Sequence, residues 1–148
     1  MSRLEYDSRI YVSYYPVVIA LVFLIAVLLT PVPAKGRFLG RALTALFIAT
    51  LLAHVNRIFG LWPAHLLFPS GHTTFCAGLS WSLAMLRPWT LFLTIPLLIC
   101  LAVSLVALQL HETMDVIGAF PLVLAIYGPI HAWWRLPGDA VASQCEIR

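Results

Sequence analysis

The chain has 148 residues, of which 61% are hydrophobic and only 10% are charged, and its mean hydropathy is +0.94. About a quarter of the residues in a soluble domain are charged, so this composition argues against an ordinary soluble protein and predicts an integral membrane protein. The formal charge of +3 does not indicate a nucleic-acid partner, because no basic stripe interleaved with aromatic residues accompanies it.

Five apolar segments follow one another along the chain, at about residues 11–32, 42–59, 70–86, 89–110 and 116–134. Each is close to the ~17–25 residues that a membrane-spanning helix needs, and the interior of a bilayer favours helices because every backbone polar group must be satisfied within the segment. We therefore predict an all-α fold. It would be a single integral-membrane domain over residues 1–148, a bundle of about five transmembrane helices with a short polar tail at about 136–148.

The first apolar segment has two interpretations. Arg3 and Arg9 precede it and residues 32–34 read Val-Pro-Ala, as in a signal peptide with a cleavage site. Its apolar stretch of about 20 residues exceeds the ~7–15 of a signal-peptide core, which favours a retained helix.

The basic residues are distributed unevenly between the two sides of such a bundle. Alternating helices place Lys35, Arg37, Arg41, Arg87, Arg135 and Arg148 on one side and Arg3, Arg9 and Arg57 on the other. Because Lys and Arg are retained in cytoplasmic loops, the first side is predicted to be cytoplasmic, with the C-terminus, in a bacterial inner membrane or a plasma membrane.

Two polar motifs fall on the opposite, extracytoplasmic side. Residues 69–72 read Pro-Ser-Gly-His, and residues 111–115 read His-Glu-Thr-Met-Asp. A helix rises ~1.5 Å per residue and crosses a ~30 Å hydrocarbon core in roughly 20 residues. The stretch between His72 and His111 therefore allows one crossing and one return, which predicts that the motifs meet in one site.

The motifs contain groups suited to phosphoryl transfer. Asp115 follows His111 by four residues and would share a helical face with it. A carboxylate bonded to one imidazole nitrogen leaves the other nitrogen of His111 as a nucleophile or base. His72 could then protonate a departing alkoxide.

A second group of residues is suited to binding the phosphate itself. Ser70 and Gly71 lie where the third helix begins, a position that favours anions, and glycine allows close approach to the backbone. Arg57, at the end of the second helix, offers a planar fork of donors for phosphate oxygens. No carboxylate cluster suited to magnesium is visible, so neither a metal nor another cofactor is predicted.

Each motif also has a structural interpretation. Ser-Gly-His could be a turn with a helix cap, and the His111–Asp115 pair could be a hydrogen-bonded pair in a polar turn. Arg57 could anchor its helix at the membrane interface. The convergence of scarce ionisable residues on one side favours the catalytic interpretation.

At these residues the chain resembles the type 2 phosphatidic acid phosphatase superfamily of membrane lipid phosphatases and phosphotransferases. Residues 69–72 match its Pro-Ser-Gly-His motif, and Ser104, His111 and Asp115 keep the register of its Ser-Arg-x5-His-x3-Asp motif. Arg57 matches the arginine of its first motif. Three positions depart from the family, because Thr50, Ile58 and Leu105 replace its lysine, proline and arginine.

The resemblance covers about residues 57–120 and implies a metal-free mechanism. His111 would attack phosphorus to form a phosphohistidine, oriented by Asp115. His72 would protonate the leaving group and then activate water or an acceptor alcohol. Ser70, Gly71 and Arg57 would hold the phosphoryl oxygens. The family usually has six membrane helices and this chain supplies five, so a homo-oligomer is compatible with the sequence.

Because the lysine and the second arginine of the family motifs are absent, the sequence does not decide between substrate classes. One arginine suits a phosphodiester better than a dianionic monoester, and residues 111–116 resemble the His-Tyr-Thr-x-Asp-Val motif of the sphingomyelin synthase branch. The alternatives are a lipid phosphate monoester or diphosphate phosphatase, a phosphodiester-directed headgroup transferase or phospholipase-C-like enzyme, and a non-catalytic membrane scaffold or transporter subunit. Gln109 is a candidate to supply neutral donors in place of a cation.

Overall fold

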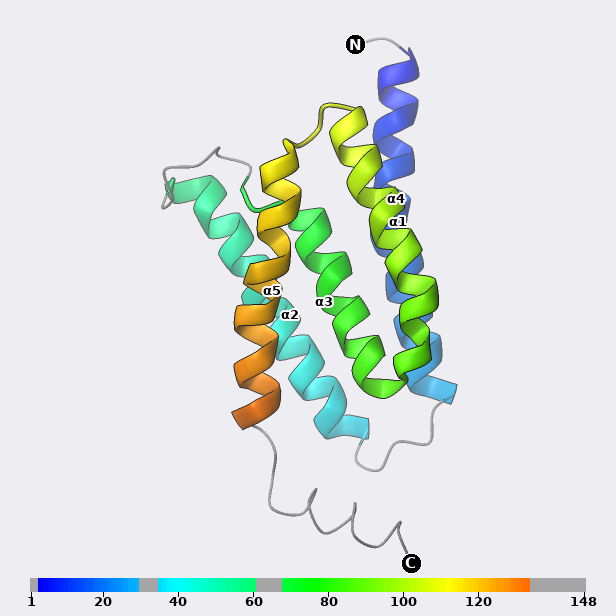
Figure 1. The fold of residues 1–148 in the computed structure, drawn as a ribbon, viewed down its shortest axis with the longest axis vertical. Coiled ribbons are helices and arrows are strands. Elements are labelled where there is room, and N and C mark those ends of the chain that lie inside the picture. Colours follow the sequence, from blue (N-terminus) through cyan, green and yellow to red (C-terminus); the bar gives the residue numbers. More distant parts are fainter. Residues whose placement is uncertain (1–2, 30–34, 61–67, 134–148) are drawn as a thin grey trace, which may run out of the picture.

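In a computed structural model the protein is a bundle of helices (Figure 1), and the structure describes residues 3–29, 35–60 and 68–133. The described residues form five α-helices and no strand: α1 (Arg3–Leu29), α2 (Lys35–Phe59), α3 (Gly71–Leu86), α4 (Leu91–Ala107) and α5 (Thr113–Trp133). A single 3-10 turn, η1 (Pro88–Thr90), connects α3 to α4. The prediction of an all-α fold is confirmed.

Several helix ends differ from the predicted ones. α1 and α2 begin at Arg3 and Lys35, well before the apolar segments predicted from residues 11 and 42, because polar first turns continue these helices beyond their apolar cores. α4 ends at Ala107, before the predicted residue 110, and α5 begins at Thr113, before the predicted residue 116. The polar tail predicted at 136–148 and the cleavage-site sequence at 32–34 lie outside the described residues.

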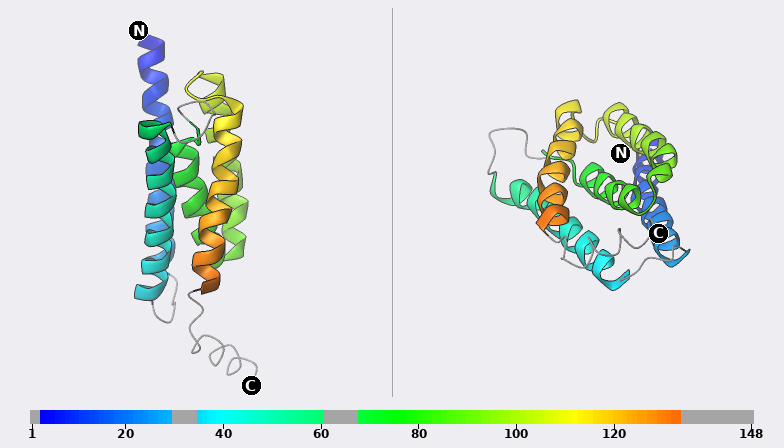
Figure 2. Two further views of the ribbon diagram at one scale, coloured as in Figure 1. Left: turned by 90° about the vertical axis from the view of Figure 1, so that its left-hand side faces the viewer. Right: turned by 60° about the horizontal axis from the view of Figure 1, so that its bottom comes forward.

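Helix α3 lies at the centre of the bundle and contacts each of the other four α-helices (Figure 2). It is short, with 16 residues, and nine of them are buried. Small residues allow this close packing: a Cβ atom added at Gly78 would lie 2.6 Å from the Tyr127 hydroxyl oxygen of α5. The hydroxyls of Ser80 and Ser82 donate to the carbonyls of Cys76 and Gly78 in their own helix, which satisfies them without water.

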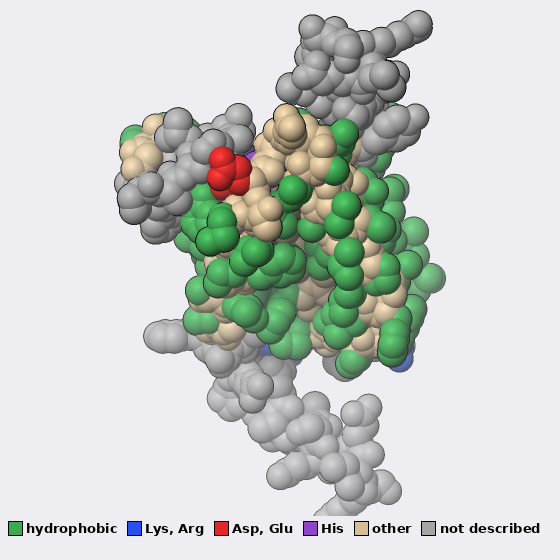
Figure 3. All heavy atoms as spheres, turned by 45° about the horizontal axis from the view of Figure 1, so that its top comes forward, with side chains coloured by type: hydrophobic (Ala, Val, Ile, Leu, Met, Phe, Trp, Pro, Cys, Tyr) green, Lys and Arg blue, Asp and Glu red, His purple; other side chains and the backbone are tan. Residues whose placement is uncertain are grey.

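The face of the bundle seen in Figure 3 is largely hydrophobic. On α4, Phe92 is 87% exposed and Val103 is 61% exposed, and on α2 Phe47 is 66% exposed. Within the described residues, three helical stretches are long and apolar enough to cross a membrane, Gly36–Val55, Pro88–Ala107 and Thr113–Ile130. The apolar part of α1 (Tyr14–Leu29) is shorter. Three of the five predicted spans therefore correspond to helices that are long and apolar enough to cross a membrane.

The helices run alternately up and down (Figures 1 and 2), which brings the α2–α3 and α4–α5 connections to one end of the bundle. The end of α2, the start of α3 and the connection from α4 to α5 all lie there. The start of α2, with Arg37 and Arg41, and the end of α3, with Arg87, lie at the opposite end. The two polar motifs are therefore at the same end of the molecule, as their spacing predicted.

Candidate active site

His111 follows a tight turn that ends α4. The Leu110 amide donates to the Leu105 carbonyl at 3.0 Å and the Gln109 amide donates to the Val106 carbonyl at 3.0 Å. These are the two hydrogen bonds of a Schellman motif, in which the chain reverses through a residue with left-handed backbone. That residue is Gln109, with a φ of 54°. The His111 amide also donates to the Leu105 carbonyl, at 3.2 Å, so the turn fixes the backbone of His111 directly.

The Asp115 carboxylate caps helix α5 and also lies close to His111. Its Oδ2 accepts a hydrogen bond from the Glu112 amide at 3.0 Å, and this caps the first turn of α5. The same Oδ2 lies 3.5 Å from Nδ1 of His111, and the Asp115 side chain is only 1% exposed. His111 precedes α5, so the predicted shared helical face was wrong. The cap brings the two side chains together instead.

The two motifs are joined through their backbones. The Ser70 amide donates to the Asp115 carbonyl at 2.8 Å. Ser70 and Asp115 are both buried, so the hydrogen bond lies in an environment that strengthens it. Residues 69–72 and 111–115 therefore form one continuous polar structure, although α4 and the rest of α3 separate them in sequence.

Ser70 acts as the N-cap of α3. Its Oγ accepts hydrogen bonds from the Thr73 amide at 3.4 Å and from the Thr73 hydroxyl at 3.1 Å. Its carbonyl accepts from the amide and the hydroxyl of Thr74. These contacts shape the helix start, so the Ser70 side chain, predicted to bind phosphate, organises the turn from a buried position. The Gly71 amide comes first in the helix, where no helical carbonyl is available to it.

His72 lies in the first turn of α3 and is exposed, in contrast to Ser70. Its imidazole is therefore on the accessible side of the helix start, at the bundle end that also carries His111. Acidic and histidine side chains are visible together at this end in Figure 3. The predicted acid and nucleophile thus share one end of the bundle.

A third histidine also borders the helix start. A Cβ atom added at Gly71 would lie 3.4 Å from Cε1 of His54, so this imidazole from α2 packs beside Gly71. Nδ1 of His54 lies 2.8 Å from the Thr50 carbonyl oxygen. A carbonyl only accepts hydrogen bonds, so Nδ1 carries the proton and Nε2 is the nitrogen left for a ligand. From the sequence alone, His54 is interpreted as a polar or interfacial residue that borders the proposed site. The sequence signal that could have identified His54 as a site residue is its position three residues before Arg57, which places both residues on the same helix face.

The other predicted residues have mixed placements. The Arg57 backbone lies near the end of α2, at the site end of the bundle, and its side chain lies outside the described structure. Ser104 donates its hydroxyl to the Cys100 carbonyl at 2.7 Å, within α4. Gln109 is exposed in the turn before His111.

The positions that depart from the family motifs also have distinct environments. Leu105 is fully buried in the core of the bundle, so an arginine there would face apolar neighbours. Thr50 donates its hydroxyl to the Leu46 carbonyl at 2.7 Å. Among the described residues, no group of three or more His, Cys, Asp or Glu side chains could hold a metal ion.

No family model, curated protein or solved structure matches this chain.

Proposed function

We propose that this protein spans a membrane and is a phosphatase or phosphotransferase acting on a lipid phosphate ester. The observation that carries the proposal is the hydrogen bond from the Ser70 amide to the Asp115 carbonyl. It joins the start of α3, a position that favours anions, to a turn that holds a carboxylate 3.5 Å from a histidine nitrogen. A phosphohistidine mechanism needs an anion-binding position and a nearby imidazole, and here a carboxylate lies 3.5 Å from one nitrogen of that imidazole.

In this mechanism Asp115 holds Nδ1 of His111, and Nε2 attacks phosphorus. The nitrogen–phosphorus bond forms while the bond between phosphorus and the lipid oxygen breaks. His72 gives its proton to the departing oxygen. In the second half, His72 takes a proton from water or an acceptor alcohol, whose oxygen attacks phosphorus and releases neutral His111. The products are inorganic phosphate and an alcohol, or a transferred headgroup.

His54 and the Gly71 amide complete the phosphate site in our proposal. The family lysine position holds Thr50, whose hydroxyl is bonded to its own helix. One turn further along α2, the imidazole of His54 lies against Gly71. With Nδ1 bonded to a carbonyl, a protonated His54 would present Nε2–H to a phosphoryl oxygen and supply the positive charge that Thr50 does not.

A second candidate is a phosphodiester-directed transferase or phospholipase-C-like activity. The observation that favours it is the full burial of Leu105, which replaces the second arginine of the resembling motif. A monoester dianion needs more positive partners than a diester monoanion, because burying an unpaired charge is costly. Arg37, Arg41 and Arg87 lie at the opposite end of the bundle and do not compensate.

The loop charges support an orientation in which the site faces away from the cytoplasm. Arg37, Arg41 and Arg87 lie at the end opposite to the motifs, which fits the retention of basic residues inside. The membrane in question would be a bacterial inner membrane or a plasma membrane.

The test is a substrate panel with the full chain purified in detergent in the presence of EDTA. Phosphatidate and an isoprenyl diphosphate represent monoesters and diphosphates, and phosphatidylcholine with a labelled headgroup represents diesters. We expect turnover of one class, lost in His111→Ala and in His72→Ala. The control is His131→Ala, which changes a histidine at the far end of α5.

Phosphate release would favour the phosphatase, and headgroup transfer without free phosphate would favour the diester enzyme. If no substrate is turned over by folded parent protein, or if the His111→Ala and His72→Ala variants match it, the catalytic proposal is wrong. A scaffold or transporter subunit would then be the remaining alternative.

A further inference from the structure

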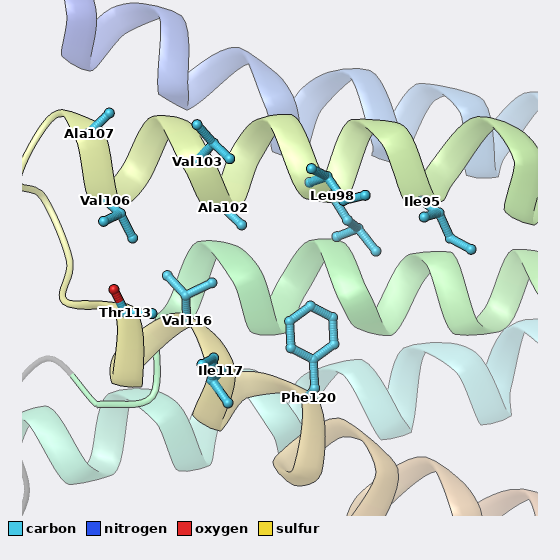
Figure 4. A pocket seen from close by; sticks show the side chains of 11 residues that line it. Ile95, Leu98, Ala102, Val103, Val106, Ala107, Thr113, Val116, Ile117 and Phe120 are labelled. Carbon is cyan, nitrogen blue, oxygen red and sulfur yellow. The ribbon is translucent and has the colours of Figure 1, made fainter.

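An apolar groove runs between α4 and α5 on the side of the bundle (Figure 4). Its volume is about 600 Å³, and its lining includes Leu98, Ala102 and Val106 from α4 and Thr113, Val116 and Phe120 from α5. Among the described residues that line the groove, Thr113 has the only polar side chain. A groove of this composition suits a hydrocarbon chain and offers nothing to a polar ligand except at one end.

The polar end of the groove lies at the candidate active site. Thr113 and Val116 line the groove, and both belong to the first turn of α5, which Asp115 caps. On the other wall, Ala107 is the last residue of α4 before the turn that carries His111. The groove is therefore continuous with the segment that carries the proposed nucleophile.

The length of the groove corresponds to one leaflet of a membrane. Its α4 wall extends from Ile95 to Ala107, and these 12 helical steps amount to ~18 Å at ~1.5 Å each. Half of the hydrocarbon core is ~15 Å deep. A lipid with its phosphate at the end of the bundle would extend its chain along this depth.

We propose that the groove between α4 and α5 holds one hydrocarbon chain of the lipid substrate and thereby positions its phosphoryl group at His111. This inference rests on the proposed function. Lipid tails in the bilayer are as apolar as the groove, so binding gains little from the hydrophobic effect. The benefit is positional, because a chain fixed in the groove holds the reacting group in place.

A second groove of about 430 Å³ continues toward the other end of the bundle and is lined by residues of α3, α4 and α5, among them Ala84, Leu91 and Leu124. Leu98 and Phe120 line both grooves, so they stand where the two meet. Phe120, the larger of the two, acts as the stop for the chain. Its removal would join the grooves along α4 from Leu91 to Ala107, a length of ~24 Å.

Chain-length selectivity tests this proposal in both directions. Phosphatidates and phosphatidylcholines with short or long acyl chains would be compared in mixed detergent micelles. Ala102→Trp fills the groove, and we expect kcat/KM for long chains to fall at least about tenfold, the scale on which an apolar pocket rejects a misfit. Short-chain substrates should change much less. Phe120→Ala should shift the preference toward longer chains.

Ala84→Trp is the matched control, because it fills the second groove and leaves the first groove open. It should keep the parent's chain-length preference. Equal losses for short and long chains in Ala102→Trp, or an unchanged preference in both Ala102→Trp and Phe120→Ala, would overturn the proposal.

A second readout does not depend on turnover. A phosphatidate with a diazirine in its acyl chain would be cross-linked to the full chain in bilayers and mapped by mass spectrometry. A diazirine-bearing alkane without a headgroup reports general lipid contact. We expect the phosphatidate to label the groove walls on α4 and α5 preferentially, and to do so less in Ala102→Trp.

Equal labelling of all lipid-facing helices by both probes would mean that only bulk lipid occupies the groove, and the proposal would be wrong. Selective labelling of a protein that turns over no substrate would support the groove while removing the proposed function. Substrate turnover combined with unselective labelling would support the proposed function and overturn the role of the groove.

Discussion

The Ser70 amide and the Asp115 carbonyl, 2.8 Å apart, join the start of α3 to the start of α5. The same Asp115 caps α5 through Oδ2 and approaches Nδ1 of His111 with that oxygen. One residue therefore connects two helix starts and an imidazole. Asp115 therefore contributes to the stability of the fold through its cap and, in the proposed mechanism, to catalysis through its charge.

Two substitutions of Asp115 separate those contributions. Asp115→Asn keeps a carbonyl oxygen for the Glu112 amide but loses the charge next to His111. We expect kcat to fall on the order of 10²–10⁴-fold with a small change in Tm. Asp115→Ala also removes the cap and should lose about 1 kcal/mol more of unfolding free energy. Equal activity of Asp115→Asn and the parent would show that the carboxylate charge has no catalytic role.

Leu105→Arg restores the arginine of the resembling motif but should not restore a phosphate-binding cation. Leu105 is fully buried, and an unpaired buried charge destabilises a protein by about 3–5 kcal/mol. We expect low yield of folded protein and a lower Tm in detergent. Leu105→Met is the control for size and should fold normally. A well-folded Leu105→Arg variant with faster monoester turnover would contradict the placement of this residue.

Gln109 carries backbone strain that glycine would relieve. Its φ of 54° lies in the left-handed region, which costs a non-glycine residue on the order of 1 kcal/mol. Gln109→Gly should therefore raise the unfolding free energy by about 0.5–1 kcal/mol, seen as a higher Tm. Gln109→Ala removes the amide and keeps the strain. Loss of activity in both variants would assign the Gln109 side-chain amide to phosphate binding. Full activity in both variants would show that Gln109 serves only to form the turn.

Gly118 allows Phe68 to pack against α5. A Cβ atom added at Gly118 would overlap the Phe68 ring, and overpacking of this kind costs about 1–3 kcal/mol. Gly118→Ala should lower Tm and, by displacing the segment before Ser70, lower activity as well. Gly128→Ala is the control, since a Cβ atom there meets nothing within 4 Å. A thermally stable and fully active Gly118→Ala variant would count against this packing.

His54 is predicted to act on substrate binding rather than on the chemical step. A hydrogen bond to a charged group contributes about 1.5–3 kcal/mol, so His54→Ala should raise KM by roughly tenfold or more with a smaller effect on kcat. His54→Gln, which keeps a neutral donor, should lie between that variant and the parent. Unchanged KM in both variants would exclude His54 from the phosphate site.

Several features followed from the sequence because they depend on local properties. Apolar segments of membrane-spanning length predict helices wherever they occur, and the structure has a helix for each of the five. The positions of the motifs at one end followed from helix rise alone. The end of α4 was predicted too late because Leu108 and Leu110 continue the apolar pattern. The turn depends on a left-handed backbone at Gln109, and the usual sequence signal for such a turn, a glycine, is absent at that position.

The relationships that define the site required the folded chain. The position of His54 three residues before Arg57 places it on the same face of α2, but its contact with Gly71 joins two helices and depends on how α2 and α3 pack. The full burial of Leu105 and the groove between α4 and α5 likewise depend on how whole helices pack. Composition and helix rise thus predicted the all-α fold and the placement of both motifs at one end of the bundle. Packing between distant segments decided which side chains meet there. The sequence of one helix shows which of its faces is apolar, but it does not show which residues of another helix that face will contact.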